Sequence, residues 1–482
     1  MPVVTVPTSR GSSPAPSPCH RGALMAAGRY LIKGAWALTQ DPQLGEIRSA
    51  DVLVEDGVIQ AVAPDLGDVD AEVIDGTDRF VLPGFVDTHR HSWQSLIRHM
   101  STDWTLPQYF SGVRGVLGNK YTAEDMYAAN LIAMLDALDS GITTLVDWSH
   151  NNNSPEHADA AIQAVLDSGI RAVWAYGNSN DEWLPVSDVP QSRDVVRIAE
   201  KWFSSPDQLV TLALAPRGPQ FATRDVTLQD FALAKELDIP VTVHVGDGAW
   251  GKSLPVLWME ENGLATDRTT YVHCNALSDA EYDVIARTGG AISIAPELEM
   301  HMGHGTLATL RAISRGITTS LSIDVCTSVG GDIFSAMRAC LAGTRYLVNV
   351  EALAQDVAVD PLPVLATQVL EFATQGGATA AWLGDKVGSL TPGKRADIVL
   401  LRTDVYGMQP LNYPAGAVLE SGNPQLVDTV MVDGTIVKRD GALVGHDFAR
   451  VRRLAEQARD RVLAASGVSD PGRWLPEVYP AS

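Results

Sequence analysis

The sequence contains few cysteines, a minority of basic residues and no long apolar run. Cysteine occurs four times in 482 residues, at Cys19, Cys274, Cys326 and Cys340. This scarcity excludes a secreted disulfide scaffold, and the wide spacing does not match a cysteine-type zinc site. It favours a reducing, cytoplasmic setting. The apolar runs are shorter than the roughly 20 residues that span a bilayer, so we expect no membrane partner.

Basic residues are outnumbered, with 36 Lys and Arg against 58 Asp and Glu and a formal net charge of −22 at pH 7. Such an acidic surface repels nucleic-acid phosphates and anionic lipids. We therefore expect a small-molecule substrate and no nucleic-acid partner. The hydrophobic share of 45% and the charged share of 20% are typical of a globular protein. The composition leaves a homo-oligomer open.

The middle of the chain alternates eight short β-branched runs with amphipathic helical patterns. The expected strands are Gly84–Thr88, Thr143–Asp147, Ala172–Tyr176, Val210–Ala215, Val241–His244, Thr270–His273, Ala291–Ala295 and Thr318–Asp324. Helix-start signals accompany the helical patterns, such as Thr122 with Asp125, which resembles a capping box. Eight strand–helix units of this length predict an α/β fold, a (β/α)₈ TIM barrel.

The flanks of this region are β-rich and carry Asp-Gly hairpin turns, at Asp56-Gly57 and Asp433-Gly434. Because neither flank is long enough to bury a core alone, we expect both to pair into one small β-sandwich. Residues 1–24 are rich in Pro, Ser and Thr. This composition predicts either a disordered tail or a translation start that was placed too early, upstream of the true start at Met25. The expected layout is the tail at 1–24, the sandwich at 25–83 and 386–446, the barrel at 84–385, and a C-terminal helix and tail at 447–482.

Side chains that bind metals stand at the ends of several expected strands. His89 and His91 are separated by one residue, so they point to the same side of a strand. His244, His273 and Asp324 end the fifth, sixth and eighth strands. The functional residues of a (β/α)₈ barrel gather at these carboxyl ends, and imidazole is the commonest metal ligand. The pattern indicates a metal centre.

The chain resembles the amidohydrolase superfamily, in the branch of cytosine deaminase and the triazine hydrolases. The resemblance extends from Tyr30 to Val444 and rests on separated motifs in the expected order, at Pro83–His91, Val243-His244, Val272–Asp279, Ser322–Asp324 and Gly393–Leu400. It implies a barrel with a flanking β-sandwich. It also implies metal ligands at His89, His91, His244 and Asp324, with His273 beside the metal-bound water or the substrate.

The chemistry of these residue types agrees with that ligand set. Three imidazoles and one carboxylate suit a single divalent ion, zinc or iron(II), with one position open for water. The metal lowers the pKa of that water toward ~7. Asp324 can then accept a proton, and His273 can stabilise the developing oxyanion. Superfamily members with two metals usually have a carboxylated lysine on the fourth strand, and Leu212–Arg217 contains none.

Asp247 departs from the pattern of the branch. Deaminases of the branch usually carry Glu three residues after the histidine of the fifth strand, whereas this chain has Asp247 three residues after His244. Aspartate has the same chemistry with one methylene less reach. Asp247 either serves as the acid for a differently placed substrate, belongs to a reaction that needs no ring-nitrogen protonation, or caps the following helix.

Further polar and aromatic side chains follow the strand ends and are candidates for substrate contact. They are Trp93, His150, Arg217, Glu297, His301 and His304. A tryptophan there can stack on a flat heterocycle or pack in the barrel wall. A histidine in a glycine-rich segment, such as His301 or His304, can contact substrate or remain solvated.

These observations predict a metal-dependent hydrolase of a C–N bond that deaminates a small nitrogen heterocycle through a metal-activated water. One alternative is hydrolysis of a non-aromatic amide, imide or amidine bond, or of a C–Cl bond. A second alternative is a catalytically inactive barrel that acts as a binding protein. The complete ligand set speaks against the second alternative.

Overall fold

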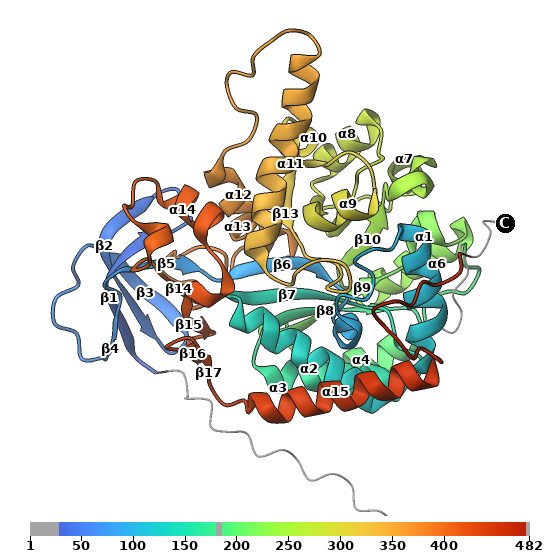
Figure 1. Cartoon of the computed structure of the whole chain (residues 1–482), viewed down its shortest axis with the longest axis horizontal. Coiled ribbons are helices and arrows are strands. Elements are labelled where there is room, and N and C mark those ends of the chain that lie inside the picture. The colour runs from blue at the N-terminus through green and yellow to red at the C-terminus, as the bar shows by residue number, and fades with distance from the viewer. Residues whose placement is uncertain (1–27, 180–185, 479–482) are drawn as a thin grey trace, which may run out of the picture.

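The computed structural model describes residues 28–179 and 186–478, which form a barrel and a smaller β domain (Figure 1). The expected tail at 1–24 lies outside the described residues. Cys274, Cys326 and Cys340, the cysteines within the described ranges, are buried and free. Among the helices of these ranges, none combines the length and the apolar character that a membrane span requires.

The barrel is an eight-stranded sheet in which the strands follow one another in chain order. Its strands are β6 (Phe85–Arg90), β7 (Ile142–Ser149), β8 (Arg171–Gly177), β9 (Val210–Ala215), β10 (Val241–Val245), β11 (Thr269–His273), β12 (Ala291–Ile294) and β13 (Thr318–Leu321). The backbone N–H of Asp324 donates to the carbonyl of His89 at 2.9 Å, which joins the last strand to the first. The predicted (β/α)₈ barrel is therefore confirmed.

Helices cover the outside of the barrel (Figure 1). The outer helices are α2 (Ala123–Asp139), α3 (Pro155–Ser168), α4 (Asp194–Trp202), α6 (Arg224–Glu236), α7 (Pro255–Glu261), α8 (Asp279–Thr288), α10 (Thr309–Ile313) and α11 (Ile333–Leu353). The predicted capping box at the start of α2 is formed, because the Asp125 N–H donates to Thr122 Oγ1 at 3.3 Å and the Thr122 N–H donates to Asp125 Oδ2 at 3.0 Å.

Short elements follow several strands and supply much of the surface near the strand ends. They are η1 (Ser92–Ile97), α1 (Leu106–Tyr109), η2 (Phe110–Leu117), η3 (Gly118–Lys120), α5 (Gly218–Phe221), η4 (Gly248–Lys252) and α9 (Pro296–Met302). Later elements outside the barrel sheet are α12 (Ala366–Phe372), α13 (Gln375–Ala380), η5 (Tyr406–Met408), α14 (Pro414–Ser421), η6 (Pro424–Leu426) and α15 (Phe448–Ala465).

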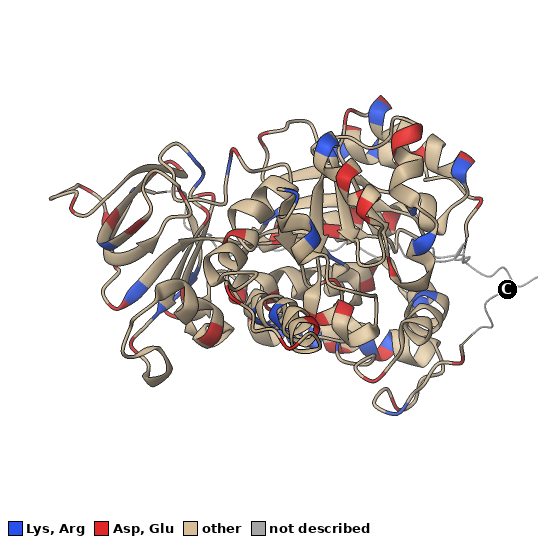
Figure 2. Ribbon diagram, turned by 90° about the horizontal axis from the view of Figure 1, so that it is seen from above, with Lys and Arg blue, Asp and Glu red and all other residues tan. Residues whose placement is uncertain are grey.

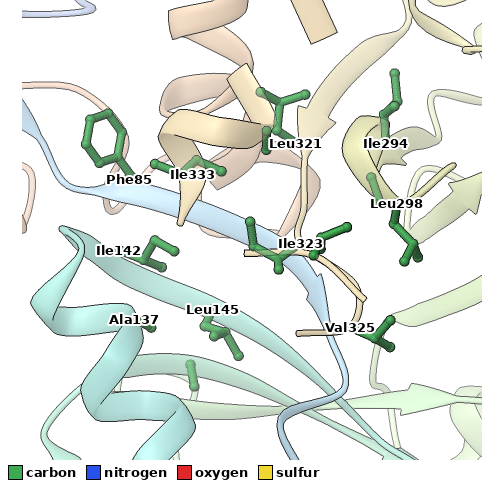
Figure 3. Packing of buried hydrophobic residues seen from close by; sticks show 14 of the residues in the cluster. Phe85, Ala137, Ile142, Leu145, Ile294, Leu298, Leu321, Ile323, Val325 and Ile333 are labelled. Carbon is green, nitrogen blue, oxygen red and sulfur yellow. The ribbon is translucent and has the colours of Figure 1, made fainter. Parts of the chain in front are cut away.

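Apolar side chains fill the layer between the strands and the helices. Figure 3 shows Ile142 and Leu145 of β7 on the side of Ala137 of α2, and Phe85 of β6 near Ile333 of α11. All five side chains are fully buried. This packing holds each strand in place, and it thereby sets where the strand ends.

The β domain is built from both ends of the described chain, as the sequence predicts. Its strands are β1 (Tyr30–Leu38), β2 (Glu46–Glu55), β3 (Val58–Ala63), β4 (Glu72–Asp75), β5 (Arg79–Pro83), β14 (Ile398–Arg402), β15 (Val427–Val432), β16 (Thr435–Arg439) and β17 (Ala442–Leu443). Antiparallel pairing of β5 with β14 joins the two flanks. The sheet has a hydrophobic core of its own. Its β3 edge is joined to the C-terminal flank, because Ile59 exchanges backbone hydrogen bonds with Lys394 and Gly393 at 2.9 and 2.8 Å.

The expected C-terminal helix is α15, which packs on α2 (Figure 1). The guanidinium group of Arg461 on α15 pairs with the buried carboxylate of Asp125. Figure 2 shows acidic and basic residues interspersed over both parts of the molecule. Many of them pair on the outer helices, such as Arg197 with Asp159 at 3.0 Å.

A buried ion pair joins the β domain to the barrel. Arg171 begins β8, and its guanidinium group binds both carboxylate oxygens of Asp397 at 2.9 Å. Asp433 accepts a further bond from Arg171 at 2.8 Å. Arg171 is 3% exposed and Asp397 is 2% exposed. Paired in this bidentate geometry, the two charges are satisfied away from water.

Replacing Arg171 with Met should lower the free energy of unfolding by about 3–5 kcal/mol, because Asp397 would remain as a buried, uncompensated charge. Urea denaturation monitored by tryptophan fluorescence measures the change. The control is Arg193→Met, which removes an exposed pair with Glu236 and should leave the stability nearly unchanged. Equal effects of the two substitutions would contradict a role of the buried pair.

Candidate metal centre and active site

Five side chains meet at the carboxyl ends of the barrel strands. Nε2 of His89 and Nε2 of His91 lie 3.4 and 3.3 Å from Oδ1 of Asp324. Nε2 of His273 lies 3.5 Å from Oδ2 of the same carboxylate. The ring of His244 is centred 4.8 Å from that of His89. The structure thus brings together the four predicted ligands and the predicted catalytic histidine.

The local structure of β6 directs both of its histidines to this point. The pairing of β6 with β7 shifts register between Asp87 and Arg90. Arg90 donates to Asp87 at 2.7 Å and to the carbonyl of Gly331 at 2.8 Å, so its side chain is held in the barrel wall. Irregularities of this kind re-aim side chains at the edges of sites. His89 and His91 consequently face each other, with ring centres 4.7 Å apart.

The histidines have the protonation and orientation that metal ligands require. Burial, followed by the proximity of His89, lowers the pKa of His91 and of His244 well below the usual range, which favours neutral imidazole. Nδ1 of His91 lies 2.9 Å from the carbonyl of Trp148, a contact in which Nδ1–H donates and Nε2 is left for the cluster.

His89 supplies the strongest sign of a missing partner. Its side chain is fully buried, and neither ring nitrogen makes a hydrogen bond to any residue in the described ranges. Its neighbours could hold an ion, because ligand atoms of His89, His91 and Asp324 lie within 4.8 Å of one another. A buried imidazole without a protein partner, set among neutral imidazoles and a carboxylate, fits a divalent metal ion.

His273 is held by a glutamate that was not among the sequence candidates. Its Nδ1 lies 3.1 Å from Oε1 of Glu299, which is fully buried and also accepts the N–H of Ala295 at 2.8 Å. Burial alone would lower the pKa of His273. The hydrogen bond to Glu299 and the charges of Asp247 and Asp324 outweigh burial and raise that pKa to about 9.

Two of the central residues have backbone conformations that L-amino acids rarely adopt. The φ angles are +72° at His273 and +63° at Asp324. A non-glycine residue in this region costs about 1–3 kcal/mol, and such residues persist where the surrounding structure holds them. Here the closure of the barrel holds Asp324, because its N–H is bonded to His89 at the end of β6 and its carbonyl to His91 just after that strand.

A cavity opens onto the cluster, and its empty space, counted together with the open solvent at its mouth, is about 630 Å³. The sequence candidates that line it are His91, His150, Arg217, His244, Asp247, His273, His304 and Asp324. Its other walls include Leu106, Tyr109, Phe110, Arg114, Trp148, Asn178, Phe221, Leu298, Met302 and Val325. The cavity therefore combines a polar floor with a largely apolar and aromatic mouth.

Three sequence candidates for substrate contact take other positions. Trp93 is fully buried behind His150, to whose Nδ1 its indole N–H donates at 3.1 Å. Glu297 is half-buried on α9, and the neighbouring Glu299 is the one that reaches His273. His301 is exposed, with its Nε2 2.7 Å from the carbonyl of Thr102.

Sequence patterns missed the wall formed by α1 and η2. The segment η2 is a π-helix, and it places Phe110 and Arg114 on the cavity. Its apolar residues Phe110, Val113 and Leu117 are spaced as in an ordinary α-helix, so the sequence offered no signal for π-helical geometry. Extended π-helical geometry is rare and often marks functional sites.

The fold and the cluster define a class of protein, the barrel hydrolases that bind a metal ion at the ends of their strands. The chain belongs to the amidohydrolase family, whose profile matches residues 80–437. It is an enzyme that hydrolyses C–N bonds of small molecules with the help of a metal ion. The predicted family and enzyme class are confirmed.

Similar proteins of known activity cover nearly the whole chain. The 5'-deoxyadenosine deaminase of Methanothermobacter thermautotrophicus is 30% identical over 426 residues, which are 86% of this chain and 95% of that protein. The 5-methylthioadenosine/S-adenosylhomocysteine deaminase of Desulforudis audaxviator is also 30% identical, over 451 residues, 90% of this chain and 99% of that protein.

Solved structures share the fold at lower identity. An adenosine deaminase from Xanthomonas campestris with bound zinc has a TM-score of 0.79 at 23% identity, covering 91% of this chain and 99% of that one. Atrazine chlorohydrolase from Arthrobacter aurescens TC1 complexed with zinc has a TM-score of 0.79 at 24% identity, covering 89% and 100%. At this identity the two structures support the fold.

Replacing His89 with Ala or Asp324 with Ala should remove the bound metal and abolish activity, because each change deletes a ligand from a site with few donors. Metal analysis of the purified proteins checks the first effect and turnover checks the second. His157→Gln, on the outer helix α3, should retain the full metal content. Normal metal content in the His89 or Asp324 variant would exclude that residue as a ligand.

Proposed function

We propose that the protein is a zinc aminohydrolase that replaces the exocyclic amino group of an adenine-type nucleoside with oxygen and releases ammonia. The observation that supports this function most strongly is the convergence of three histidines and Asp324 at one point on the wall of a cavity. The two relatives at 30% identity, both deaminases of modified adenosines, support the substrate class.

The ligand set of the proposal is His89, His91, His244 and Asp324. Zinc bound there would supply an activated water at neutral pH. We infer a single ion, because β9 ends at Ala215 and the following residues, Pro216 and Arg217, include no lysine to carry a bridging carboxylate.

The residues at the cluster have separate roles in proton transfer, hydrogen bonding and the exclusion of water. Asp324 accepts a proton from the attacking water and returns it to the departing amine. His273 donates a hydrogen bond from Nε2 to the oxygen on which negative charge develops, since its raised pKa of about 9 keeps both nitrogens protonated while Glu299 accepts from Nδ1. Trp148 and His150 form the wall beside His91, where they exclude water from the reacting carbon.

The aromatic mouth favours a flat ring carrying a modest apolar extension. Phe110 and Phe221 pack against each other in the cavity wall, with ring centres 5.8 Å apart. The adjoining apolar residues Leu106, Leu298 and Met302 suit a sugar whose 5' position bears a hydrogen or an apolar substituent.

A substrate panel tests the proposed function. Zinc-loaded protein should release ammonia from 5'-deoxyadenosine or 5'-methylthioadenosine, with a matching change of the purine absorbance to that of the 6-oxo product. Cytosine and a chlorotriazine serve as comparison substrates. Chloride release from the triazine, with no ammonia from any purine, would instead identify a C–Cl hydrolase. Tight nucleoside binding without turnover would identify a binding protein.

Replacing Phe221 with Ala should raise KM about fivefold, because an aromatic contact with the substrate is worth roughly 1 kcal/mol. The effect on kcat should be smaller, since Phe221 lies at the mouth rather than at the cluster. Phe448→Ala, at an exposed position of α15, is the matched control and should leave both constants unchanged. An unaltered KM in the Phe221 variant would place the substrate elsewhere.

A further inference from the structure

Asp247 is shorter than the glutamate usual at this position, and a second side chain, His304, lies next to its carboxylate. We propose that His304 is the acid that protonates the ring nitrogen of the substrate, and that Asp247 is the positioning residue that orients His304. This inference rests on the proposed function, since it assigns a step of the same reaction.

The geometry joins the two residues directly. Nδ1 of His304 lies 3.0 Å from Oδ1 of Asp247, an ion-pair contact whose angle falls outside hydrogen-bond geometry. Both side chains are buried, with exposed fractions of 2% and 3%, and both line the cavity. Nε2 of His304 makes no hydrogen bond to a residue in the described part of the chain. The ring is centred 4.7 Å from that of His273, so this nitrogen lies beside the reaction centre.

The backbone fixes this pair before any substrate arrives. The carbonyl of His304 accepts the N–H of Gly248 at 2.9 Å, which ties the segment after α9 to the segment after β10. The N–H of His304 donates to the carbonyl of Glu299, the residue that also holds His273. The N–H of Asp247 donates to the side chain of Gln220 at 3.1 Å.

The glycine after His304 makes the approach possible. Gly305 has a φ of +135°, and a Cβ there would lie 3.1 Å from Cβ of Asn275. A side chain at this position would therefore be strained by the backbone conformation and would crowd Asn275 by a few tenths of an ångström. The sequence at 303–305, glycine, histidine, glycine, is built to bring an imidazole close to the strand ends.

A carboxylate paired with one nitrogen of an imidazole is an efficient proton donor unit. The carboxylate selects the tautomer, orients the ring and stabilises the imidazolium form. A glutamate three residues after His244 would reach the substrate alone. Aspartate is one methylene shorter, and the imidazole of His304 spans the remaining distance, with Nε2, the nitrogen opposite the Asp247 contact, as the proton donor.

The protons balance in this scheme. As the water oxygen bonds to the carbon, one water proton passes to Asp324, the electron pair of the C=N bond moves to the ring nitrogen, and that nitrogen takes the Nε2 proton of His304. The amine then takes the proton held by Asp324 and leaves as ammonia. The hydroxyl proton of the adduct, lost as the C–N bond breaks, restores His304. The net reaction consumes one water and yields the oxo product and ammonia.

The test is a rescue experiment on the zinc-loaded enzyme with the best substrate of the panel. His304→Ala should lower kcat by about 10²–10⁴, the usual size of a general-acid contribution, with KM changed less than about threefold. In the double variant Asp247→Glu with His304→Ala, the longer carboxylate can reach the ring nitrogen through the vacated space. Its kcat should exceed that of His304→Ala by at least about tenfold.

Two further measurements test whether misfolding or a second metal ion explains the loss of activity instead. His304→Gln keeps a polar side chain of similar size, and it should lose kcat like His304→Ala while retaining the thermal stability and zinc content of the unmodified enzyme. Ligand atoms of Asp247, His273 and His304 lie within 4.8 Å of one another, so these residues could instead hold a second cation. Two metal ions per chain, falling to one in His304→Gln, would overturn the relay.

The outcomes separate the relay from the proposed function. If the unmodified enzyme releases ammonia while His304→Gln keeps its kcat within about threefold, or while the double variant shows no rescue, the relay alone is wrong. If the unmodified enzyme releases no ammonia from any substrate, the proposed function fails and the relay fails with it.

Discussion

The closure of the barrel is the constraint on which the site depends. The first and last strands are joined by two backbone hydrogen bonds, from the N–H of Asp324 to His89 and from the N–H of His91 to the carbonyl of Asp324, both at 2.9 Å. These bonds place one carboxylate between two imidazoles that are far away in the sequence. Without the closure, the segment after β13 would have no fixed position relative to β6, and the proposed metal site would lack its anionic ligand.

Assembly of the central cluster costs conformational and desolvation free energy, and contacts with the surrounding residues offset that cost. Neutral imidazoles are buried there, and His273 and Asp324 have left-handed backbone conformations. The carbonyl of Trp148 and the carboxylate of Glu299 orient two of the rings, so the ligand geometry does not rely on the metal alone. The same contacts settle which nitrogen of each ring faces the cluster.

The rigid strands and the segments that follow them have different roles in the site. Strand ends supply the proposed metal ligands, because hydrogen bonds to neighbouring strands fix their positions. The following segments supply the cavity walls and the Asp247–His304 pair, and these are where members of one fold differ in substrate. The π-helix η2 and the glycine-flanked His304 are features of this second group.

The sequence by itself determined the barrel strands, the hairpin turns of the β domain and the five central side chains, because these follow from local rules. Two-residue alternation puts His89 and His91 on one side of a strand, and a parallel barrel collects all strand ends at one rim. Left-handed φ angles at Asp56 and Gly57 likewise match the turn that an Asp-Gly pair predicts.

Only the tertiary structure decided which of the neighbouring candidates reach the cavity. Glu299 rather than Glu297 contacts His273, and Trp148 rather than Trp93 lies on the cavity wall. Likewise His304 meets Asp247 while His301 points to Thr102. These choices depend on the path of each segment after its strand, and that path is set by packing against distant elements. Sequence spacing carries no information about such packing.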